Sequence, residues 1–249
     1  MGKNKLRKFA EMEQISFVFQ YPFAVLSREG FPLKGEWRSR FFHNDNPIVL
    51  ELGCGKGEYT VELAERFPDK NFIGIDIKGA RIWTGATRAE REGLKNVAFL
   101  RTNIELLPEF FAAGEVDEIW ITFPDPQMKK VRKRLTSSRF LDVYRKVAKP
   151  GALIHLKTDS PFLYTYTTAL IDLNGITPKV READLYGGGY DDPILAIKTF
   201  YEQQWLSRGK TIKLLKFRLG TSPLEEPDVS DLEPDDYRAL PRFNPQEAR

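Results

Sequence analysis

Strand and helix signals alternate along the chain from Pro47 to Thr158. Five runs rich in β-branched and aromatic residues have the composition of buried strands, and helical spacing of apolar residues appears between them. The strands are predicted at 47–52, 71–77, 97–102, 116–123 and 152–158, and the helices at 58–67, 79–92, 105–113 and 140–148. Near-continuous apolar strands separated by helices indicate a parallel sheet that is covered on both faces. The sequence therefore predicts an α/β fold with a doubly wound, mostly parallel sheet.

The pattern is less regular beyond Asp159. A helix is predicted over 162–173, a loop over 185–193, where three glycines follow one another, and a strand over 211–219. The segment 197–206 fits either a helix or a strand. If it is a strand, the short turn that follows it makes the pair with 211–219 antiparallel, because parallel strands need a long crossover. We therefore expect an antiparallel C-terminal strand at the end of the sheet.

The composition is that of a globular protein with one large domain or two small ones, since 249 residues are 41% apolar and 29% charged. No apolar run approaches the roughly 18 residues of a membrane helix, and the first residues lack the apolar centre of a signal peptide. The single cysteine, Cys54, argues for a reducing compartment, and two histidines leave few candidate metal ligands. We expect a cytoplasmic protein with no membrane partner and no metal site. Monomer and homodimer both remain open.

Charge and proline content divide the chain into three parts. Residues 1–46 are predicted to form a basic N-terminal arm, and residues 47–220 to form the α/β domain. Residues 221–249 form an acidic tail with five prolines and a net charge of −5, so the rest of the chain carries +8. Such a tail is expected to be irregular, lying on the domain or disordered. A body with this positive charge favours a polyanionic partner.

The first predicted strand ends in ELGCGKG, residues 51–57. Glycines at this point, here Gly53 and Gly55, let the backbone turn tightly and approach a nucleotide closely. Their spacing differs from the GxGxxG of dinucleotide-binding proteins. Glu51 stands at the strand end, where a carboxylate would repel a pyrophosphate but suit a cationic ligand. A plain turn with a surface acid is the alternative interpretation.

Two more polar residues close the next two predicted strands. Asp76 lies 19 residues after Gly57, where an acid can bind both hydroxyls of a ribose. Asn103 is placed to bind the edge of an adenine, and the alternative for both residues is a helix N-cap. A ligand with a ribose, a positive centre and no phosphate is S-adenosylmethionine. NAD fits less well because of the charge of Glu51.

The fourth predicted strand runs into Phe-Pro-Asp-Pro at 123–126. The two prolines restrict the backbone around Asp125, so its carboxylate is a preorganised group at the ligand-binding edge of the sheet. A run of bases follows within a few residues: Lys129, Lys130, Arg132, Lys133, Arg134 and Arg139. So dense a run resembles a footprint for nucleic-acid phosphates more than a helix face, although a plain solvated surface is the alternative.

Together these motifs resemble the tRNA (guanine-N(7)-)-methyltransferase family. The resemblance covers roughly residues 47 to 219. It rests on GxGxG after an acid, FPDPxxKK with further bases, Lys-Thr-Asp at 157–159, and Thr-x-x-Glu from Thr199 to Glu202. The resemblance implies a Rossmann-like class I fold that transfers a methyl group from S-adenosylmethionine to a guanosine in the variable loop of tRNA. It also implies site residues: a cofactor site formed by Glu51, Gly53, Gly55, Asp76, Asn103 and Asp125; Asp125 as the catalytic carboxylate; and substrate contacts from Lys129, Asp159, Thr199 and Glu202.

The chain departs from the family pattern at a few positions. Gln127 stands where the family commonly has tryptophan, and the basic run contains no histidine. Asn103 stands where aspartate is frequent, and Phe200 and Tyr201 form an aromatic pair inside the Thr-x-x-Glu element. These positions are where we expect this protein to bind its ligands differently.

Three other functions share some of these features. An NAD-dependent oxidoreductase would share the sheet and Asp76, but Glu51 disfavours it. A non-enzymatic RNA-binding module needs the basic run but not the acids Glu51, Asp76 and Asp125 together. A methyltransferase for another RNA or for a small molecule is the remaining alternative, and a small molecule would not require the basic run.

Overall fold

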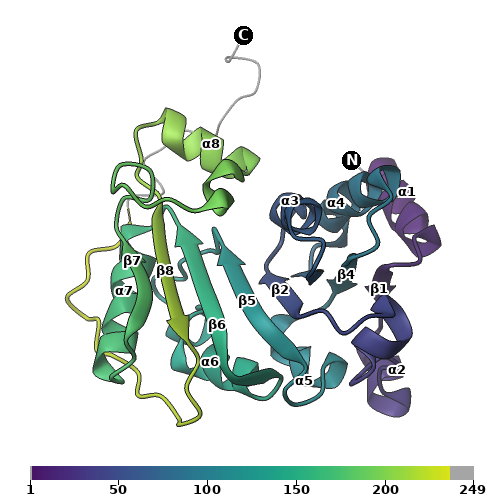
Figure 1. Ribbon diagram of the computed structural model, residues 1–249, viewed down its shortest axis with the longest axis horizontal. Helices are drawn as coiled ribbons and strands as arrows, with labels where there is room; N and C mark the ends of the chain where they lie inside the picture. Colours follow the sequence, from purple (N-terminus) through teal and green to yellow (C-terminus); the bar gives the residue numbers. More distant parts are fainter. Residues whose placement is uncertain (1, 236–249) are drawn as a thin grey trace.

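Eight strands form one sheet in the computed structural model, which describes residues 2–235 (Figure 1). Their order across the sheet is β1-β4-β3-β2-β5-β6-β8-β7. The strands are β1 (Val18–Gln20), β2 (Ile48–Leu52), β3 (Asn71–Asp76), β4 (Val97–Arg101), β5 (Val116–Thr122), β6 (Ala148–Thr158), β7 (Pro178–Glu182) and β8 (Lys213–Arg218). The first six run parallel, and β8 is antiparallel to both of its neighbours. The predicted doubly wound, mostly parallel sheet with an antiparallel C-terminal strand is confirmed.

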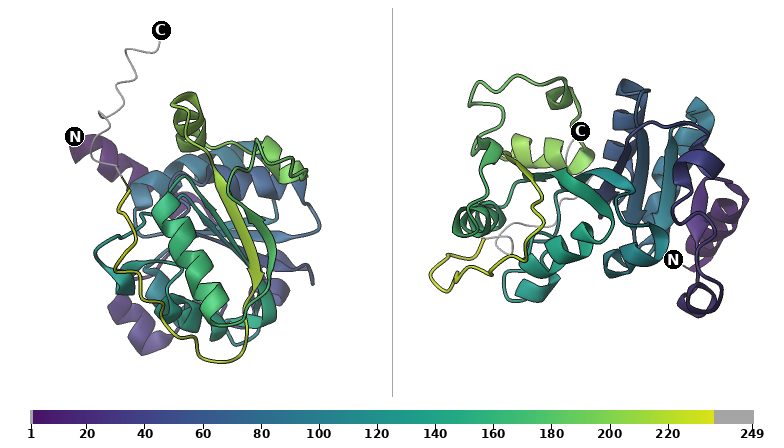
Figure 2. Two further views of the ribbon diagram at one scale, coloured as in Figure 1. Left: turned by 90° about the vertical axis from the view of Figure 1, so that its left-hand side faces the viewer. Right: turned by 60° about the horizontal axis from the view of Figure 1, so that its bottom comes forward.

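Helices cover both faces of this sheet (Figures 1 and 2). The α-helices are α1 (Gly2–Gln14), α2 (Phe23–Glu29), α3 (Glu58–Arg66), α4 (Gly79–Glu92), α5 (Leu107–Phe110), α6 (Ser138–Arg145), α7 (Pro161–Leu173) and α8 (Phe200–Ser207). A π-helical turn lies at Trp37–Phe42, and 3-10 turns lie at Ile104–Leu106, Val131–Lys133 and Pro193–Ala196. Within the described residues, no helix is both long enough and apolar enough to cross a membrane.

Side-chain alternation along the strands builds one apolar core on each face. Ile48 and Leu50 of β2 pack with α2, α5, α6 and α7, whereas Val49 between them packs on the other face with α1, α3 and α4. All three side chains are at most 1% exposed. Burial on both faces explains why the strand sequences are apolar at nearly every position rather than at every second one.

The N-terminal segment, expected as a basic arm, is folded into the domain. β1 pairs in parallel with β4 at the sheet edge, and α1 packs on α4. Behind them, Trp37 stacks on Phe111 with ring centroids 5.5 Å apart, and its Nε1 donates to the carbonyl oxygen of Phe110 at 3.0 Å. Aromatic packing thus holds this segment on the domain, although basic residues outnumber acidic ones in it. Its strand β1 has only three residues, which is too short to show periodicity in the sequence.

The last strand, β8, does not pair with the segment 197–206, which the sequence left open as a helix or a strand. The segment 197–206 contributes the helix α8, and β8 instead pairs with β6 and β7. Thr199 explains this choice, because its hydroxyl accepts a hydrogen bond from the amide of Glu202 at 3.2 Å and so caps the helix. The Thr-x-x-Glu element is therefore a helix start.

After β8, residues 221–235 form a segment without helix or strand that we call the C-terminal strap. It runs back along α7 toward the carboxyl ends of the parallel strands (Figures 1 and 2). The expected acidic tail includes 236–249, which lie outside the described residues. Leu224, Val229 and Leu232 pack against the apolar core, so this part of the tail lies on the domain.

Candidate functional site

One predicted site residue lies at or just beyond the carboxyl end of each of five neighbouring parallel strands. Glu51 lies within β2 near its end, Asp76 ends β3, and Asn103, Asp125 and Asp159 follow β4, β5 and β6. Because parallel strands bring their carboxyl ends to one edge, these residues gather there, and α8 lies above the ends of β5 and β6 (Figure 1). The topology thus assembles a site from positions more than 100 residues apart.

The glycine loop after β2 folds over the end of β3. Gly53 and Gly55 have positive φ angles of 74° and 57°, which other residues rarely adopt. The amide of Gly55 donates to Asp76 Oδ2 at 2.9 Å, and the amide of Lys78 donates to its Oδ1 at 2.7 Å. Asp76 is therefore not a helix N-cap; it joins the glycine loop to the end of β3. A Cβ at Gly57 would lie 2.6 Å from the Phe99 ring, so only glycine fits there.

Glu51 is a buried carboxylate, 4% exposed, without a basic partner among residues 2–235. Its Oε2 accepts hydrogen bonds from the amide and hydroxyl of Thr60, and its Oε1 accepts one from the Thr122 hydroxyl at 2.6 Å. Burial outweighs these hydrogen bonds and raises the pKa of Glu51 to about 7. A buried acid held in place without a cation fits a positively charged ligand. The two threonines have no sequence signal that would have identified them as its partners.

An open cavity of about 590 Å³ lies on the Asn103 side of the site. Asn103 occupies the N-cap position of the 3-10 turn Ile104–Leu106, but its exposed side chain makes no capping hydrogen bond and stays available to a ligand. Ile77, after β3, and Phe23, at the start of α2, also line this cavity, and 53% and 64% of their surfaces are exposed. Two exposed apolar side chains beside an amide suit a planar heterocycle with polar edges. No sequence motif predicted Phe23 at this site.

The PDP loop, residues 123–128, is held in an uncommon backbone conformation. Phe123 and Gln127, on either side of Pro-Asp-Pro, have positive φ angles of 47° and 48°. Asp125 is exposed, and its Oδ1 accepts a hydrogen bond from the amide of Gln127 at 3.0 Å. The hydrogen bond from the Gln127 amide thus restrains a carboxylate that is otherwise exposed.

Arg134 binds the backbone of this loop and, unlike the other bases of the run, is buried. It is 1% exposed, and it donates to the carbonyl oxygens of Gln127 at 3.2 Å and Met128 at 2.6 Å. Its guanidinium lies 4.7 Å from the Phe162 ring centroid and 4.4 Å from that of Tyr166. Arg134 is therefore a loop-positioning residue rather than a surface base, which the sequence run could not distinguish. The other bases of the run are exposed: Lys129, Lys130, Arg132, Lys133 and Arg139.

Two cavities meet at the end of β5. A small cavity of about 80 Å³ contains Glu51 and the glycine loop, and Thr199 at the start of α8 closes it. A larger cavity of about 470 Å³ contains Asp125 and Asp159. Both are lined by Phe123 and Tyr201, so the two spaces adjoin there. A group bound near Glu51 and a group bound near Asp159 would meet beside Asp125.

Glu202 lies behind this surface rather than on it. Its side chain is fully buried, and Lys157 Nζ lies 2.8 Å from its Oε1. The hydroxyl of Tyr186 also donates to this carboxylate. The ion pair ties α8 to the end of β6. Of the residues expected to contact substrate, the structure brings Asp159 and Thr199 to the two adjoining cavities, and Lys129 to a third cavity beyond Asp125.

Within residues 2–235, no group of three or more His, Cys, Asp or Glu side chains is arranged to hold a metal ion.

Sequence comparison identifies relatives of the whole chain. Residues 45–215 match the family model described as "Putative methyltransferase". A tRNA (guanine-N(7)-)-methyltransferase of Porphyromonas gingivalis is 63% identical over 242 residues, which cover 95% of this chain and 99% of the relative. A protein of the same name from Bacteroides thetaiotaomicron is 58% identical and covers 97% of this chain and 96% of its own.

Solved structures share the fold at low sequence identity. The 16S rRNA methyltransferase KamB superimposes with a TM-score of 0.57 and 16% identity, covering 81% of this chain and 95% of its own. The 16S rRNA (adenine(1408)-N(1))-methyltransferase of Catenulisporales acidiphilia gives a TM-score of 0.52 and 21% identity, covering 77% and 94%. The sheet is thus that of class I S-adenosylmethionine-dependent methyltransferases. Given its fold, the family model and these relatives, this chain belongs to the tRNA (guanine-N(7)-)-methyltransferase family.

Proposed function

We propose that this protein transfers a methyl group from S-adenosylmethionine to N7 of a guanosine in the variable loop of tRNA. The observation that carries the proposal is the position of Asp125. It is an exposed carboxylate that lines the cavity adjoining the one with the buried acid Glu51, and it lies next to the exposed basic run. The family relatives carry the name of this activity. We infer a cytoplasmic location from the tRNA substrate and the single cysteine.

The residues around the glycine loop fit S-adenosylmethionine. Glu51 would accept hydrogen bonds from the cationic amino group of the methionine part, which supplies the positive charge that this buried carboxylate lacks. Asp76 would bind the ribose hydroxyls, and Asn103 would bind the adenine beside Ile77. Gly53 and Gly55 leave room for close approach of the ligand. The bound cofactor supplies an electrophilic methyl group on a sulfonium.

The role of Asp125 follows from the chemistry of the acceptor atom. N7 of guanine carries a lone pair and no proton, so no base has to act before N7 attacks the methyl carbon. The bond from carbon to sulfur breaks as the bond from N7 to carbon forms, and the positive charge moves from the sulfonium to the guanine. Asp125 would accept hydrogen bonds from the base and so orient N7, and its negative charge would stabilise the cationic product.

The remaining contacts are divided between base and backbone. Asp159 would hold the donor edge of the guanine, since it lines the same cavity as Asp125. Thr199 would contact the ligands where α8 covers the cavity that contains Glu51. The Glu202 carboxylate is buried and paired with Lys157. We propose that Glu202 positions α8 against the substrate and does not contact the substrate itself. Lys129 would hold a phosphate.

Charge reversal at Lys129 and Lys130 is expected to lower the affinity for tRNA and to make that affinity less dependent on salt concentration. Each phosphate contact contributes roughly 0.7–0.9 to the slope of log K against log salt, so losing both should flatten the slope by about 1.5. Fluorescence anisotropy with tRNA at several salt concentrations measures it. Lys146→Glu, an exposed lysine just after α6, is the control for each single Lys129→Glu or Lys130→Glu variant and makes the same charge change. An unchanged slope for the Lys129 and Lys130 variants would show that the basic run is only solvated.

Transfer of labelled methyl groups to a set of tRNA transcripts tests the proposed substrate. The protein is incubated with methyl-labelled S-adenosylmethionine and an unmodified transcript, or with a transcript whose variable-loop guanosines are replaced by adenosine. We expect label only in the first. Equal labelling of both transcripts would overturn the proposed location of the target, and no labelling of either would overturn the proposed function.

A further inference from the structure

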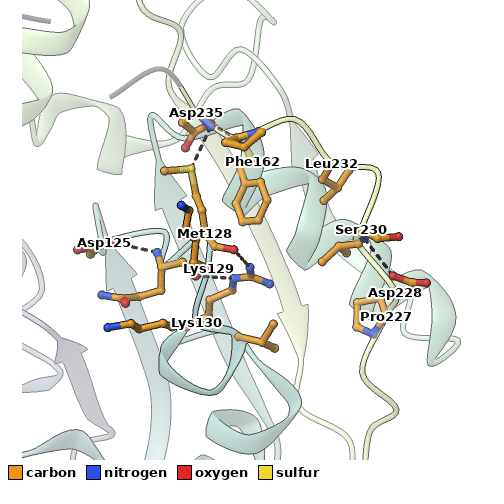
Figure 3. A pocket seen from close by; sticks show the side chains of 15 residues that line it. Asp125, Met128, Lys129, Lys130, Phe162, Pro227, Asp228, Ser230, Leu232 and Asp235 are labelled. Atoms are coloured by element: carbon orange, nitrogen blue, oxygen red, sulfur yellow. Dashed lines mark hydrogen bonds between the residues drawn. The ribbon is translucent and has the colours of Figure 1, made fainter. Parts of the chain in front are cut away.

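A third cavity, of about 1040 Å³, lies on the far side of the PDP loop from the cavity that contains Asp159. One wall comes from the loop and the basic run, including Asp125, Met128 and Lys129, and the opposite wall comes from the C-terminal strap, including Leu232. Figure 3 shows these two walls with Phe162 between them. The strap lies outside residues 45–215, which match the family model. One wall of the cavity is therefore formed by a segment that this family model does not include.

The strap is fixed to the domain at both ends of this cavity. Glu226 accepts hydrogen bonds from the amide and hydroxyl of Ser138 at the N-terminus of α6, at 3.1 and 2.7 Å. Asp235 accepts one from the amide of Phe162, at 2.9 Å, at the N-terminus of α7. Both acids thus lie where the helix dipole favours negative charge. Between them, Leu232 packs against the apolar core. The strap is a wall of the cavity.

The acids of the strap leave the basic rim of the cavity free. Lys129 and Lys130 are exposed, and within residues 2–235 neither makes an ion pair with an acid of the strap. The carboxylate of Asp235 is instead bound by the Ser160 hydroxyl and the Phe162 amide. The described part of the strap therefore makes no direct ion pair with these two lysines, although Asp228 and Asp235 line the same cavity.

The inner surface of the cavity is mainly apolar. The Met128 thioether, the Phe162 ring and the Leu232 side chain line it, together with Pro227 and Pro234. Arg134 also lies on its wall, where its guanidinium packs against the Phe162 ring. An apolar chamber with ammonium groups at its mouth suits a nucleobase attached to a phosphate.

We propose that this cavity receives the nucleobase next to the target guanosine in the RNA strand, while Lys129 and Lys130 hold the connecting phosphates. The inference rests on the proposed function, because Asp125 borders both this cavity and the one that contains Asp159. One strand could place the target guanine in the cavity on one side of Asp125 and its neighbour in the cavity on the other side. Residues 227–235 of the strap thereby become part of the RNA site.

A double-mutant cycle between protein and RNA tests this inference. Leu232→Ala is combined with tRNA transcripts that are abasic immediately before or immediately after the target guanosine, and dissociation constants are measured by fluorescence anisotropy. Stacking of one base contributes about a tenfold gain in affinity or more. In the wild-type protein we expect a loss of about tenfold for one of the two abasic transcripts, and in Leu232→Ala a clearly smaller loss for that transcript.

Leu224→Ala is the matched control, because it removes the same side chain from the same strap and also packs on the core, but Leu224 does not line the cavity. The factors by which Leu224→Ala and the abasic site change the dissociation constant should multiply, which means that their binding free energies add. Additive behaviour of Leu232→Ala with both abasic transcripts would overturn the inference. Tighter tRNA binding by Leu232→Ala would overturn it too, since it would mean that the strap covers the RNA site. Continued methylation of tRNA in either case would leave the proposed function standing.

Discussion

Replacing Asp125 by asparagine is expected to reduce the turnover of tRNA methylation by about 100- to 1000-fold. Asparagine keeps the oxygen that accepts the hydrogen bond from the Gln127 amide, so the PDP loop should keep its conformation. What it removes is the negative charge that orients the guanine and stabilises the cationic base, and electrostatic contributions of this kind have that size. Single-turnover methylation at saturating tRNA and cofactor measures the change directly.

The loss should be confined to the chemical step. Asp125 is one contact among many in an interface dominated by phosphates, so the dissociation constant for tRNA should stay within about threefold. Asp184→Asn is the control, because Asp184 is also a loop acid that accepts a hydrogen bond from a backbone amide, yet it lines neither cavity beside Asp125. Near-normal turnover of Asp125→Asn would contradict the proposal that Asp125 orients the guanine and stabilises the cationic product.

Replacing Glu51 by glutamine is expected to stabilise the unliganded protein and to weaken cofactor binding. Burial raises the pKa of Glu51 from 4.5 to about 7, so its charged form is held against a penalty of about 3 kcal/mol, at 1.4 kcal/mol per pH unit. Glutamine removes that penalty, and at pH 8 the melting temperature should rise by roughly 5–10 °C. The affinity for S-adenosylhomocysteine should fall by about 100-fold, because a buried charge-assisted interaction is lost.

The pH dependence of these effects has a definite sign. The pKa of Glu51 is higher in the folded than in the unfolded chain, so its contribution to stability is fully present below pH 4.5 and is lost as the pH rises through about 7. The stability gained by Glu51→Gln should therefore grow between about pH 4.5 and 7, be complete above neutral pH and vanish in acid. Wild-type affinity for S-adenosylhomocysteine should weaken as the pH falls below about 7, and the variant should show no such trend.

Calorimetric titrations between pH 6 and 8.5, with melting curves in the same buffers, measure both effects. Glu109→Gln, an exposed acid on α5 remote from the glycine loop, is the control and should change neither quantity. A Glu51→Gln protein that melts and binds like the wild type at pH 8 would contradict the buried-acid site.

The sheet and its ligand edge could be predicted from the sequence because both depend on local patterns. Apolar strands such as 47–52 are buried on both faces and remain recognisable one by one, and each is followed by its polar residue. β1 and β7 escaped prediction because their signals are weak. β1 has three residues, and β7 alternates between half-buried and exposed positions at the sheet edge.

Residues whose role depends on burial could not be assigned from their neighbours in sequence. Arg134 stands among surface lysines yet turns inward against Phe162, and Glu202 stands beside exposed aromatic residues yet pairs with Lys157. Both positions are set by contacts with α7 or β6 that lie far away along the chain. The same holds for Thr60 and Thr122, which become partners of Glu51 only when β2, β5 and α3 are packed together.

Identifying the methylated nucleoside tests the central claim most directly. The protein is incubated with unmodified tRNA and methyl-labelled S-adenosylmethionine, the RNA is digested to nucleosides, and the label is located by chromatography and mass spectrometry. The expected product is 7-methylguanosine, absent from a parallel reaction with Asp125→Asn stopped within one wild-type turnover. Label in 1-methyladenosine or another nucleoside, or no transfer to RNA at all, would contradict the claim that this site methylates N7 of guanosine in tRNA.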